Sequence, residues 1–256
     1  MTVHCYVEPE RQRKTKLIMQ AVAAGCDGIV VQGAYLEPRG EGVFWGHRWF
    51  SERAIPEMIR QGRRWWLIDN GYWNPSNGVP QTGYHRITCD GLAPRLVDRP
   101  ADRFEHQNVP IRAWRKTGSH IVVCHPGPHF GQPLGLRMAD WSATIVKRLR
   151  RHTDRPIIER HKGVLRPIEH DLADAWAVVT HSSNAAVTAV CEGIPVFVEP
   201  TSAAAPVGNL SLTAIEDPAM PDGRLAWAAS LAYQQFTLNE IRAGIAWRRM
   251  QEIVNA

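Results

Sequence analysis

No stretch of this 256-residue sequence approaches the roughly 18–20 consecutive apolar residues that a membrane span needs. The first residues, MTVHCYVEPERQRK, also lack the apolar core of a signal peptide, so we expect a cytoplasmic protein. The five cysteines are odd in number, widely separated and without CxxC spacing, which predicts reduced thiols rather than a disulfide framework. No internal repeat or low-complexity segment appears, and the composition, 44% hydrophobic and 21% charged, is that of a globular protein.

Metal-ligand motifs at short spacing are also scarce, since the sequence has no HxH or DxD motif. The remaining route to a metal is the convergence of His125, His161 and His181, each of which follows an expected strand. Because no HxH or DxD motif supports that route, the sequence predicts that no metal is required.

Charge and tryptophan are the two unusual features of the composition. The net charge of +5 and the pI near 9.1 fit a polyanionic partner but do not require one. Of the ten tryptophans, five lie between residues 45 and 73. Their rings either belong to the core or line a cleft in which they stack on sugars or bases.

Short apolar runs alternate with amphipathic segments along the chain, which predicts an α/β protein with parallel sheets. The expected strands are Val3–Val7, Gly28–Val31, Trp65–Ile68, His120–Cys124, Arg155–Glu159, Ala177–Thr180 and Val196–Glu199. The expected helices are Lys14–Ala24, followed by Gly25, then Glu52–Gln61, capped by Ser51, and Asp171–Trp176 and Ala185–Glu192. A further helix is capped by Asp140 and places Trp141, Ile145 and Leu149 on one face. The final helix begins with the capping box Thr237–Glu240 and continues through Trp247.

Residues 74–112 are rich in Pro, Gly, Asn and Asp and show poor periodicity, so we expect loops and an interdomain linker there. The sequence thus predicts two facing Rossmann-like lobes with a cleft between them. Residues 1–112 are expected to form the N-terminal lobe, and residues 113–256 the C-terminal lobe with closing C-terminal helices.

A polar turn follows the strand Ala177–Thr180 and leads directly into a helix of small residues. Open α/β sheets bind ligands at the carboxyl ends of their strands. Backbone N–H groups at the helix start and the hydroxyls of Ser182 and Ser183 suit a diphosphate, with His181 and Asn184 completing the turn. The alternative is that one serine merely caps the helix, and physical chemistry alone leaves the two interpretations about even.

The segment AWAVVTHSSNAAVTAVCEGIPVFVEP, residues 175–200, resembles the donor-binding element of glycosyltransferases of the GT-B architecture. Capsule-polysaccharide transferases and sugar-nucleotide epimerases share this element. The likeness covers residues 118–256 well and the first lobe in outline. It implies that residues 113–256 bind a nucleotide-sugar donor, most simply a UDP-sugar, whose diphosphate lies on the turn at residues 181–184. It further implies that residues 1–112 bind the acceptor. It also implies that no metal or other cofactor is required, since a basic loop and a helix start can take up the charge of the leaving diphosphate.

The resemblance extends to further donor contacts. Arg160 and Lys162, in the loop after the strand Arg155–Glu159, match a basic residue beside the diphosphate; a surface turn is the alternative. Many of these enzymes hold the donor ribose with a Glu five residues before the Gly, but Thr188 occupies that position here. Either Thr188 takes a weaker version of the role, or Glu192 or Glu199 holds the ribose instead.

Inverting glycosyl transfer also needs a base that removes the proton of the acceptor hydroxyl. Asp69 follows the strand Trp65–Ile68 and is the first candidate; a carboxylate that only holds an Asx-turn is the alternative. His125, at the end of the strand His120–Cys124, is the second candidate. Glu37 and Glu41 are the third.

The C-terminal pattern, from RPIEHDLADAWAVV to LAYQQFTLNEIRAGIAW, is similar to small bacteriophage transferases that glycosylate hydroxymethylated pyrimidines in DNA. This likeness implies a DNA acceptor, without a membrane or protein partner, in the cytoplasm of an infected bacterium. The alternatives are a transferase for a surface glycan or small molecule, and a nucleotide-sugar epimerase or silent nucleotide-binding protein. Acceptor contacts need cations for phosphates and aromatic rings for a base. The candidates are Trp45, Arg48, Tyr72, His85 and Arg86, with Arg39, Arg63 and Arg64 as further phosphate contacts.

Overall fold

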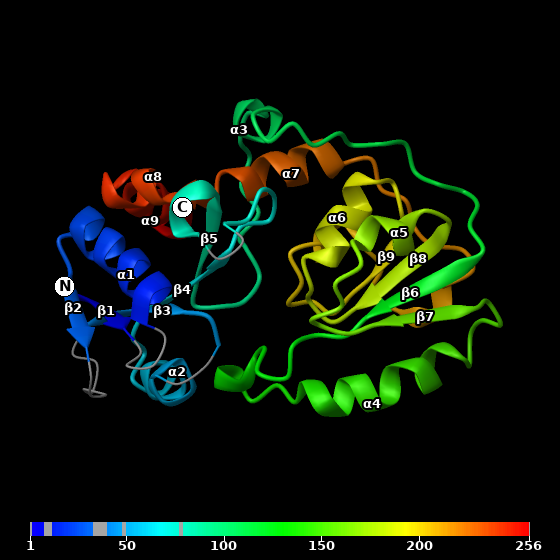
Figure 1. Ribbon diagram of the computed structural model, residues 1–256, viewed down its shortest axis with the longest axis horizontal. Coiled ribbons are helices and arrows are strands. Elements are labelled where there is room, and N and C mark those ends of the chain that lie inside the picture. Colours follow the sequence, from blue (N-terminus) through cyan, green and yellow to red (C-terminus); the bar gives the residue numbers. More distant parts are fainter. Residues whose placement is uncertain (1, 8–11, 33–39, 48–49, 77–78, 256) are drawn as a thin grey trace. The chain divides into compact units, whose positions relative to one another are not determined.

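The computed structural model describes residues 2–7, 12–32, 40–47, 50–76 and 79–255. The chain divides into two compact units, each built on its own sheet (Figure 1). Unit 1 comprises Met1–Arg99, His129–Leu136 and Ser230–Ala256, and unit 2 comprises Pro100–Pro128 and Arg137–Ala229. This division differs from the predicted lobes 1–112 and 113–256, because the chain returns to unit 1 after residue 229 and its C-terminal helices pack there.

Unit 1 contains a six-stranded mixed sheet in the order β10-β5-β4-β3-β1-β2. The strands β1 to β4 are parallel, whereas β5 runs antiparallel to β4 and β10 antiparallel to β5. The prediction of an all-parallel sheet is therefore wrong at this edge, where β5 lies inside the segment expected to be loop. The strands are β1 (Val3–Val7), β2 (Ile29–Gln32), β3 (Glu41–Trp45), β4 (Trp65–Asn70), β5 (Tyr84–Cys89) and β10 (Gln235–Thr237).

Helices cover both faces of this sheet (Figure 1). On one face lie α1 (Gln12–Cys26), α8 (Leu238–Arg242) and α9 (Ile245–Asn255), and on the other lies α2 (Phe50–Arg60). Because successive strand residues point to opposite faces, the fully buried Trp65 and Trp66 enter the two cores separately. These two tryptophans are therefore core residues and do not line a cleft.

The C-terminal helices depend on glycine at two points. The helix α1 continues one residue past Gly25, where a Cβ atom would lie 2.1 Å from the carbonyl oxygen of Ile241 in α8. Gly244 has a φ of 73° and separates α8 from α9, so the single final helix expected through Trp247 is in fact two. The capping box that opens α8 is confirmed, with Thr237 and Glu240 bonded reciprocally.

Unit 2 contains a four-stranded parallel sheet in the order β7-β6-β8-β9. Its strands are β6 (His120–Cys124), β7 (Ile157–Arg160), β8 (Ala175–Thr180) and β9 (Val196–Phe197). The helix α4 (Met138–Leu149) lies on one face and α6 (Ala185–Cys191) on the other (Figure 1). The remaining helices are α3 (Asp102–Glu105), α5 (Ile168–Leu172) and α7 (Arg224–Ala232).

The helix α4 packs as its periodicity predicts, because Trp141, Ile145 and Leu149 are all buried against the sheet. It begins at Met138, so Asp140 lies in the first turn and Arg137, rather than Asp140, is the N-cap residue. None of the described helices is both long and apolar enough to cross a membrane. All five cysteines are free thiols, and four of them are buried.

Candidate functional site

The carboxyl edge of the sheet in unit 2 gathers polar side chains from all four strands. His125 follows β6, His161 and Lys162 follow β7, and Glu199 lies two residues beyond β9. The polar turn, residues 181–184, follows β8. Since the four strands are parallel, these groups meet at one edge, which is where open α/β sheets bind ligands. We call this group of residues the edge site.

Within the polar turn, hydrogen bonds hold two of the side chains in place. His181 Nδ1 and the hydroxyl of Thr201 each lie 2.8 Å from Ser182 Oγ, so Ser182 is a buried link between β8 and the segment after β9. The Ser183 hydroxyl accepts from the N–H of Ala185 at 3.2 Å. Burial lowers the pKa of His181, and the Glu199 carboxylate only partly opposes this, so the imidazole is neutral at pH 7.

Trp141 connects the parts of the edge site. Its ring meets His125 and His181 edge-on, with centroids 6.2 and 6.0 Å away. Its indole Nε1 donates to Glu199 Oε1 at 3.1 Å, and the N–H of Glu199 donates to the carbonyl of His181 at 3.0 Å. From its helical spacing, Trp141 was expected only in the core. Its contact with Glu199, 58 residues away, has no counterpart in any local pattern.

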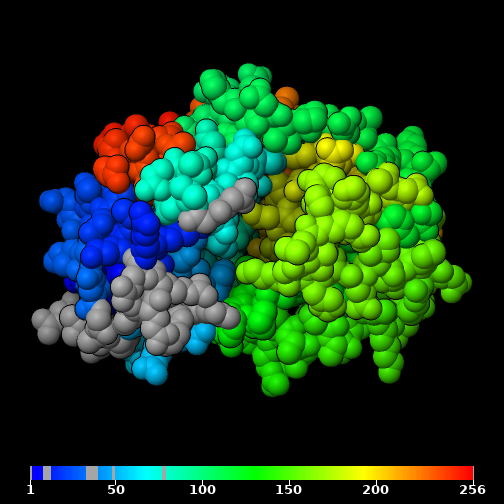
Figure 2. Space-filling model, in the orientation of Figure 1, coloured from blue at the N-terminus to red at the C-terminus, as the bar shows by residue number. Residues whose placement is uncertain are grey.

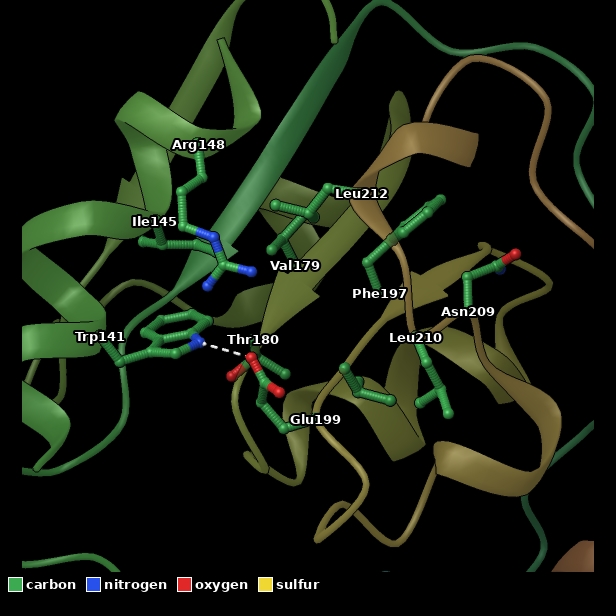
Figure 3. Close-up of a pocket in the computed structure, with 11 residues that line it drawn as sticks. Trp141, Ile145, Arg148, Val179, Thr180, Phe197, Glu199, Asn209, Leu210 and Leu212 are labelled. Carbon is green, nitrogen blue, oxygen red and sulfur yellow. Dashed lines mark hydrogen bonds between the residues drawn. The ribbon is translucent and has the colours of Figure 1, made fainter. Parts of the chain in front are cut away.

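A pocket lies beside Trp141 on the α4 face of the sheet (Figure 3). Its walls are polar and apolar in similar measure, and the side chains of Arg148, Glu199 and Asn209 provide polar groups. Figure 3 shows the side chains of Trp141, Ile145 and Arg148 pointing from α4 toward residues of β8 and β9. The pocket is lined by Trp141, Ile145, Arg148, Val179, Thr180, Phe197, Val198, Glu199, Asn209, Leu210 and Leu212.

The two predicted basic residues have different environments. Arg160 donates from Nη1 to the buried Asp171 at 2.6 Å and from Nη2 to the carbonyl of Arg166. Its charge is thus already paired, and a partner carboxylate competes with any bound anion. Lys162 is exposed, and its aliphatic chain lies over the backbone of Gly127, where a Cβ would be 3.4 Å from Lys162 Cδ. The segment 161–170 around it is almost entirely at the surface, in the yellow-green region of Figure 2.

The three ribose candidates, Thr188, Glu192 and Glu199, differ in their position relative to the polar turn. Thr188 lies one turn beyond the polar turn, with its hydroxyl 3.5 Å from the carbonyl of Asn184. Glu192 is the C-cap residue of α6 and pairs with Arg112 at 2.9 Å, so the structure does not bring it to the polar turn. Glu199, the remaining alternative, lies at the turn because its N–H is bonded to His181.

In unit 1, Asp69 and Arg86 face each other across β4 and β5, with Arg86 Nη2 donating to Asp69 Oδ2 at 2.9 Å. Asp69 is thus within β4, not after it. Burial acts to raise its pKa, but Arg86, His47 and the N–H of Asn70 outweigh burial and hold the pKa below its usual value. The Arg86 guanidinium also lies over the Tyr72 ring, 5.4 Å from its centroid. Burial raises the pKa of Tyr72 to about 12.

The opposite face of the same strands holds the other predicted acceptor residues. His85 pairs in register with Asn70, is fully buried, and has Nε2 at 3.0 Å from the carbonyl of Pro80. Trp45 meets His85 edge-on at 5.6 Å, and Lys14 lies over the Trp45 ring at 4.7 Å. Because strand residues alternate between faces, the predicted set does not form one surface. Burial lowers the pKa of His85, as expected for a neutral core histidine.

The other predicted residues of unit 1 are not brought to Asp69. Glu41 is at the opposite end of its strand and accepts from Trp66 Nε1 at 2.6 Å. Arg64 lies beside Asp90, 3.8 Å away at the closest atoms. The predicted Glu37, Arg39 and Arg48 lie outside the described residues.

No protein-family model matches this chain, and no curated protein sequence is similar to it. Solved structures do match. The beta Kdo 2,4 transferase of Thermosulfurimonas dismutans KpsC has a TM-score of 0.55 and 11% identity, over 93% of this chain and 92% of that chain. The beta Kdo 2,7 transferase of the same KpsC has a TM-score of 0.52 and 11% identity, over 97% and 100% of the two chains. At this identity the match shows the fold: a mixed α/β fold with two sheets, as in these glycosyltransferases.

Proposed function

We propose that the protein is a glycosyltransferase that binds its nucleotide-sugar donor at the edge site of unit 2. The observation that carries this proposal is the juxtaposition of the polar turn, residues 181–184, with the pocket beside Trp141. The polar turn offers hydrogen bonds of the kind that a diphosphate needs. The rim of the pocket offers the Trp141 ring and the Glu199 carboxylate to a nucleoside that lies over it. The shared fold with two Kdo transferases supports the same reaction class.

Donor binding divides among the groups of the edge site. We assign the diphosphate to the backbone N–H groups of the polar turn, the hydroxyl of Ser183 and the side-chain amide of Asn184. Lys162 is the exposed cation that offsets the charge of the leaving nucleotide. The nucleoside lies against Trp141, with Glu199 accepting from a ribose hydroxyl, in place of the family position that Thr188 occupies here. A UDP-sugar is the simplest donor. No metal ion is needed for these contacts.

Asp69 is the proposed base. Its carboxylate is ionised at pH 7, as a base must be before it accepts a proton, while the charge of Arg86 that holds the pKa below its usual value also makes it a weaker base. In the reaction, the acceptor oxygen bonds to the anomeric carbon as the bond to the diphosphate breaks, and the acceptor proton passes to Asp69. Arg86 holds this carboxylate in place. His125 and Glu41 remain the alternative bases.

For the acceptor we propose a hydroxymethylated pyrimidine in DNA. The likeness of the C-terminal sequence to phage DNA glycosyltransferases supports this, and so does the net charge of +5. The side chains of Lys147, Arg148, Arg150 and Arg151 form an exposed basic run at the C-terminal end of α4. Phosphates of a duplex are suitable partners for such a run. The alternative acceptor is a glycan, which is favoured by the names of the two matched Kdo transferases.

One experiment tests both acceptors together. The protein is incubated with a panel of nucleotide-sugars and either duplex DNA containing 5-hydroxymethylated C or U, the same duplex without the modification, or acidic oligosaccharides. Mass spectrometry then reads the nucleosides and sugars. We expect a mass gain of one sugar on the modified DNA alone, and the loss of that product as salt rises. Product on the oligosaccharide alone would identify a glycan, rather than DNA, as the acceptor. No product with any pair of donor and acceptor would overturn the proposed function.

A further inference from the structure

We propose that His125, Glu159 and His161 form a binding site for a divalent metal ion of the zinc class. One ligand atom from each residue lies within 4.8 Å of the other two. His125 Nε2 and Glu159 Oε2 are 2.9 Å apart, and the imidazoles of His125 and His161 stack at 4.2 Å with an interplanar angle of 4°. Three ligand groups with the right chemistry therefore already converge.

The pairing of β6 with β7 fixes this convergence. Cys124 pairs in register with Arg160, and the N–H of His125 donates to the carbonyl of Arg160 at 2.9 Å. This bond places His125 beside the neighbours of Arg160 in the sequence. Glu159 and His161 are two residues apart, a spacing that points both side chains to one side of an extended chain. The spacing of Glu159 and His161 is the sequence signal for this site, but the third ligand, His125, lies 34 residues before Glu159.

The ligand chemistry selects the ion. Two imidazole nitrogens and one carboxylate oxygen form the set found in zinc sites that keep one position open. Magnesium and calcium prefer all-oxygen sets, which this cluster does not offer. A fourth position remains for water or an anion, because Glu159 and His161 are exposed.

The different mobility of the three ligands also fits a site that closes on a metal ion. Ligand atoms around a tetrahedral zinc lie roughly 3.3–3.5 Å apart. The pair of His125 and Glu159, now 2.9 Å apart, must therefore open slightly, and His161 must rotate out of its stacked orientation. His125 is fixed, since only 3% of its side chain is exposed and its ring meets the edge of Trp141. The two exposed ligands, Glu159 and His161, then close on a buried one. Such rotations of exposed side chains are fast and inexpensive.

The position has a consequence that rests on the proposed function. Lys162 follows His161 directly, and Trp141 meets both His125 and His181. An ion held by the cluster adds positive charge to the same sheet edge as the polar turn, residues 181–184. It would therefore strengthen the binding of the donor diphosphate without being needed for the protein to fold.

The test uses the full chain, stripped of metal and without any donor. Calorimetric titration with zinc chloride is expected to give one saturable site, and cobalt chloride the visible absorption of a tetrahedral N/O site. His161→Ala and Glu159→Gln each remove an exposed ligand and should weaken zinc binding at least tenfold. His152→Ala, which removes an exposed histidine from the loop after α4, is the matched control and should leave the affinity unchanged.

Several outcomes would overturn the site. These are the absence of saturable zinc binding, equal affinity in His161→Ala and the parent protein, and magnesium binding as tightly as zinc. Because the titration contains neither donor nor acceptor, its result is independent of whether the glycosyltransferase proposal holds. His161 and Glu159 are exposed, so their variants remain folded and the measurement stays informative.

Discussion

The indole N–H of Trp141 donates to the carboxylate of Glu199 across 3.1 Å, and this bond joins α4 to the segment that follows β9. The N–H of Glu199 continues the connection to His181. A wall of the pocket and the polar turn are therefore positioned by one side chain. We infer that the proposed nucleoside and diphosphate contacts are coupled through Trp141.

The Trp141→Phe variant tests this coupling. It keeps an aromatic ring but removes the donor to Glu199, so we expect donor affinity to fall by about three- to tenfold, the value of one net hydrogen bond. Calorimetric titration with UDP-sugars measures it. Trp114→Phe is the matched control, since it removes another indole N–H bond in unit 2, to the carbonyl of Pro221. Equal donor affinity in the two variants would argue against a role for Trp141 in the site.

The Asp69→Asn variant tests the proposed base. The amide cannot accept the acceptor proton, so we expect kcat to fall by about 100-fold or more while donor affinity stays within twofold. A radiolabelled transfer assay and donor titration give the two numbers. Asp98→Asn, at an exposed aspartate of unit 1, is the control and should retain full activity. Full activity of Asp69→Asn would overturn the assignment of Asp69 as the base.

The same pair of variants yields a pH prediction for stability. The pKa of Asp69 is depressed in the folded protein, so its contribution is fully present above the unfolded value of about 3.9 and is lost as pH falls through the folded value. At pH 7, Asp69→Asn should cost about 1–2 kcal/mol in urea unfolding, because it removes a charge-assisted bond from Arg86. Below about pH 3.5 the difference from the parent should shrink. A constant difference across pH, or one shared by Asp98→Asn, would contradict the assignment to the ion pair.

Lys162 is expected to act on the donor rather than on the fold. It is exposed, and Lys162→Ala removes one cation from the edge site, so donor KM should rise about tenfold with little change in unfolding free energy. Steady-state kinetics at two salt concentrations measure the effect, which should be smaller at high salt. Lys116→Ala, also exposed and in unit 2, is the control for a non-specific loss of charge. A KM that rises equally in both variants would assign the effect to net charge alone.

The sequence predicted those parts of the fold whose signals are local. The strands β6 and β8 are continuous apolar runs, and their boundaries are predicted to within two residues. By contrast, β3 and β5 were missed, because EGVFW contains a glycine and follows a glycine-rich loop, and YHRITC lies among turn-forming residues. The antiparallel edge of unit 1 was missed for the same reason.

The contacts within the edge site were likewise predicted only where the residues are contiguous in sequence. The polar turn at residues 181–184 was found because a strand, a turn and a helix are contiguous in sequence. Trp141 with Glu199, and His125 with Glu159 and His161, are set by the packing of a helix on the sheet and by the register between β6 and β7. The bond between Trp141 and Glu199 has no local signature. The spacing of Glu159 and His161 is local but does not reveal His125, since the register depends on the whole sheet. The pairing of Arg160 with Asp171 likewise arises from the return of the chain through α5.

Gly25 supplies the final prediction, which concerns the C-terminal helices. Helix propensity alone favours alanine over glycine by about 1 kcal/mol, so a solvent-facing substitution would stabilise α1. Here, however, a Cβ would lie 2.1 Å from the Ile241 carbonyl, and α8 must move away from α1. We therefore expect Gly25→Ala to lower the free energy of unfolding by about 1–3 kcal/mol, the usual cost of overpacking.

Urea unfolding measures this cost, and hydrogen exchange in α8 should show faster opening in the same variant. Gly223→Ala is the matched control, since a methyl group at that position would have no atom within 4 Å, and it should change stability by less than about 0.5 kcal/mol. A stabilised Gly25→Ala would mean that α8 does not lie against α1. The assignment of residues 230–256 to unit 1 depends on that contact, because α1 with α8 and α9 forms one face of its core.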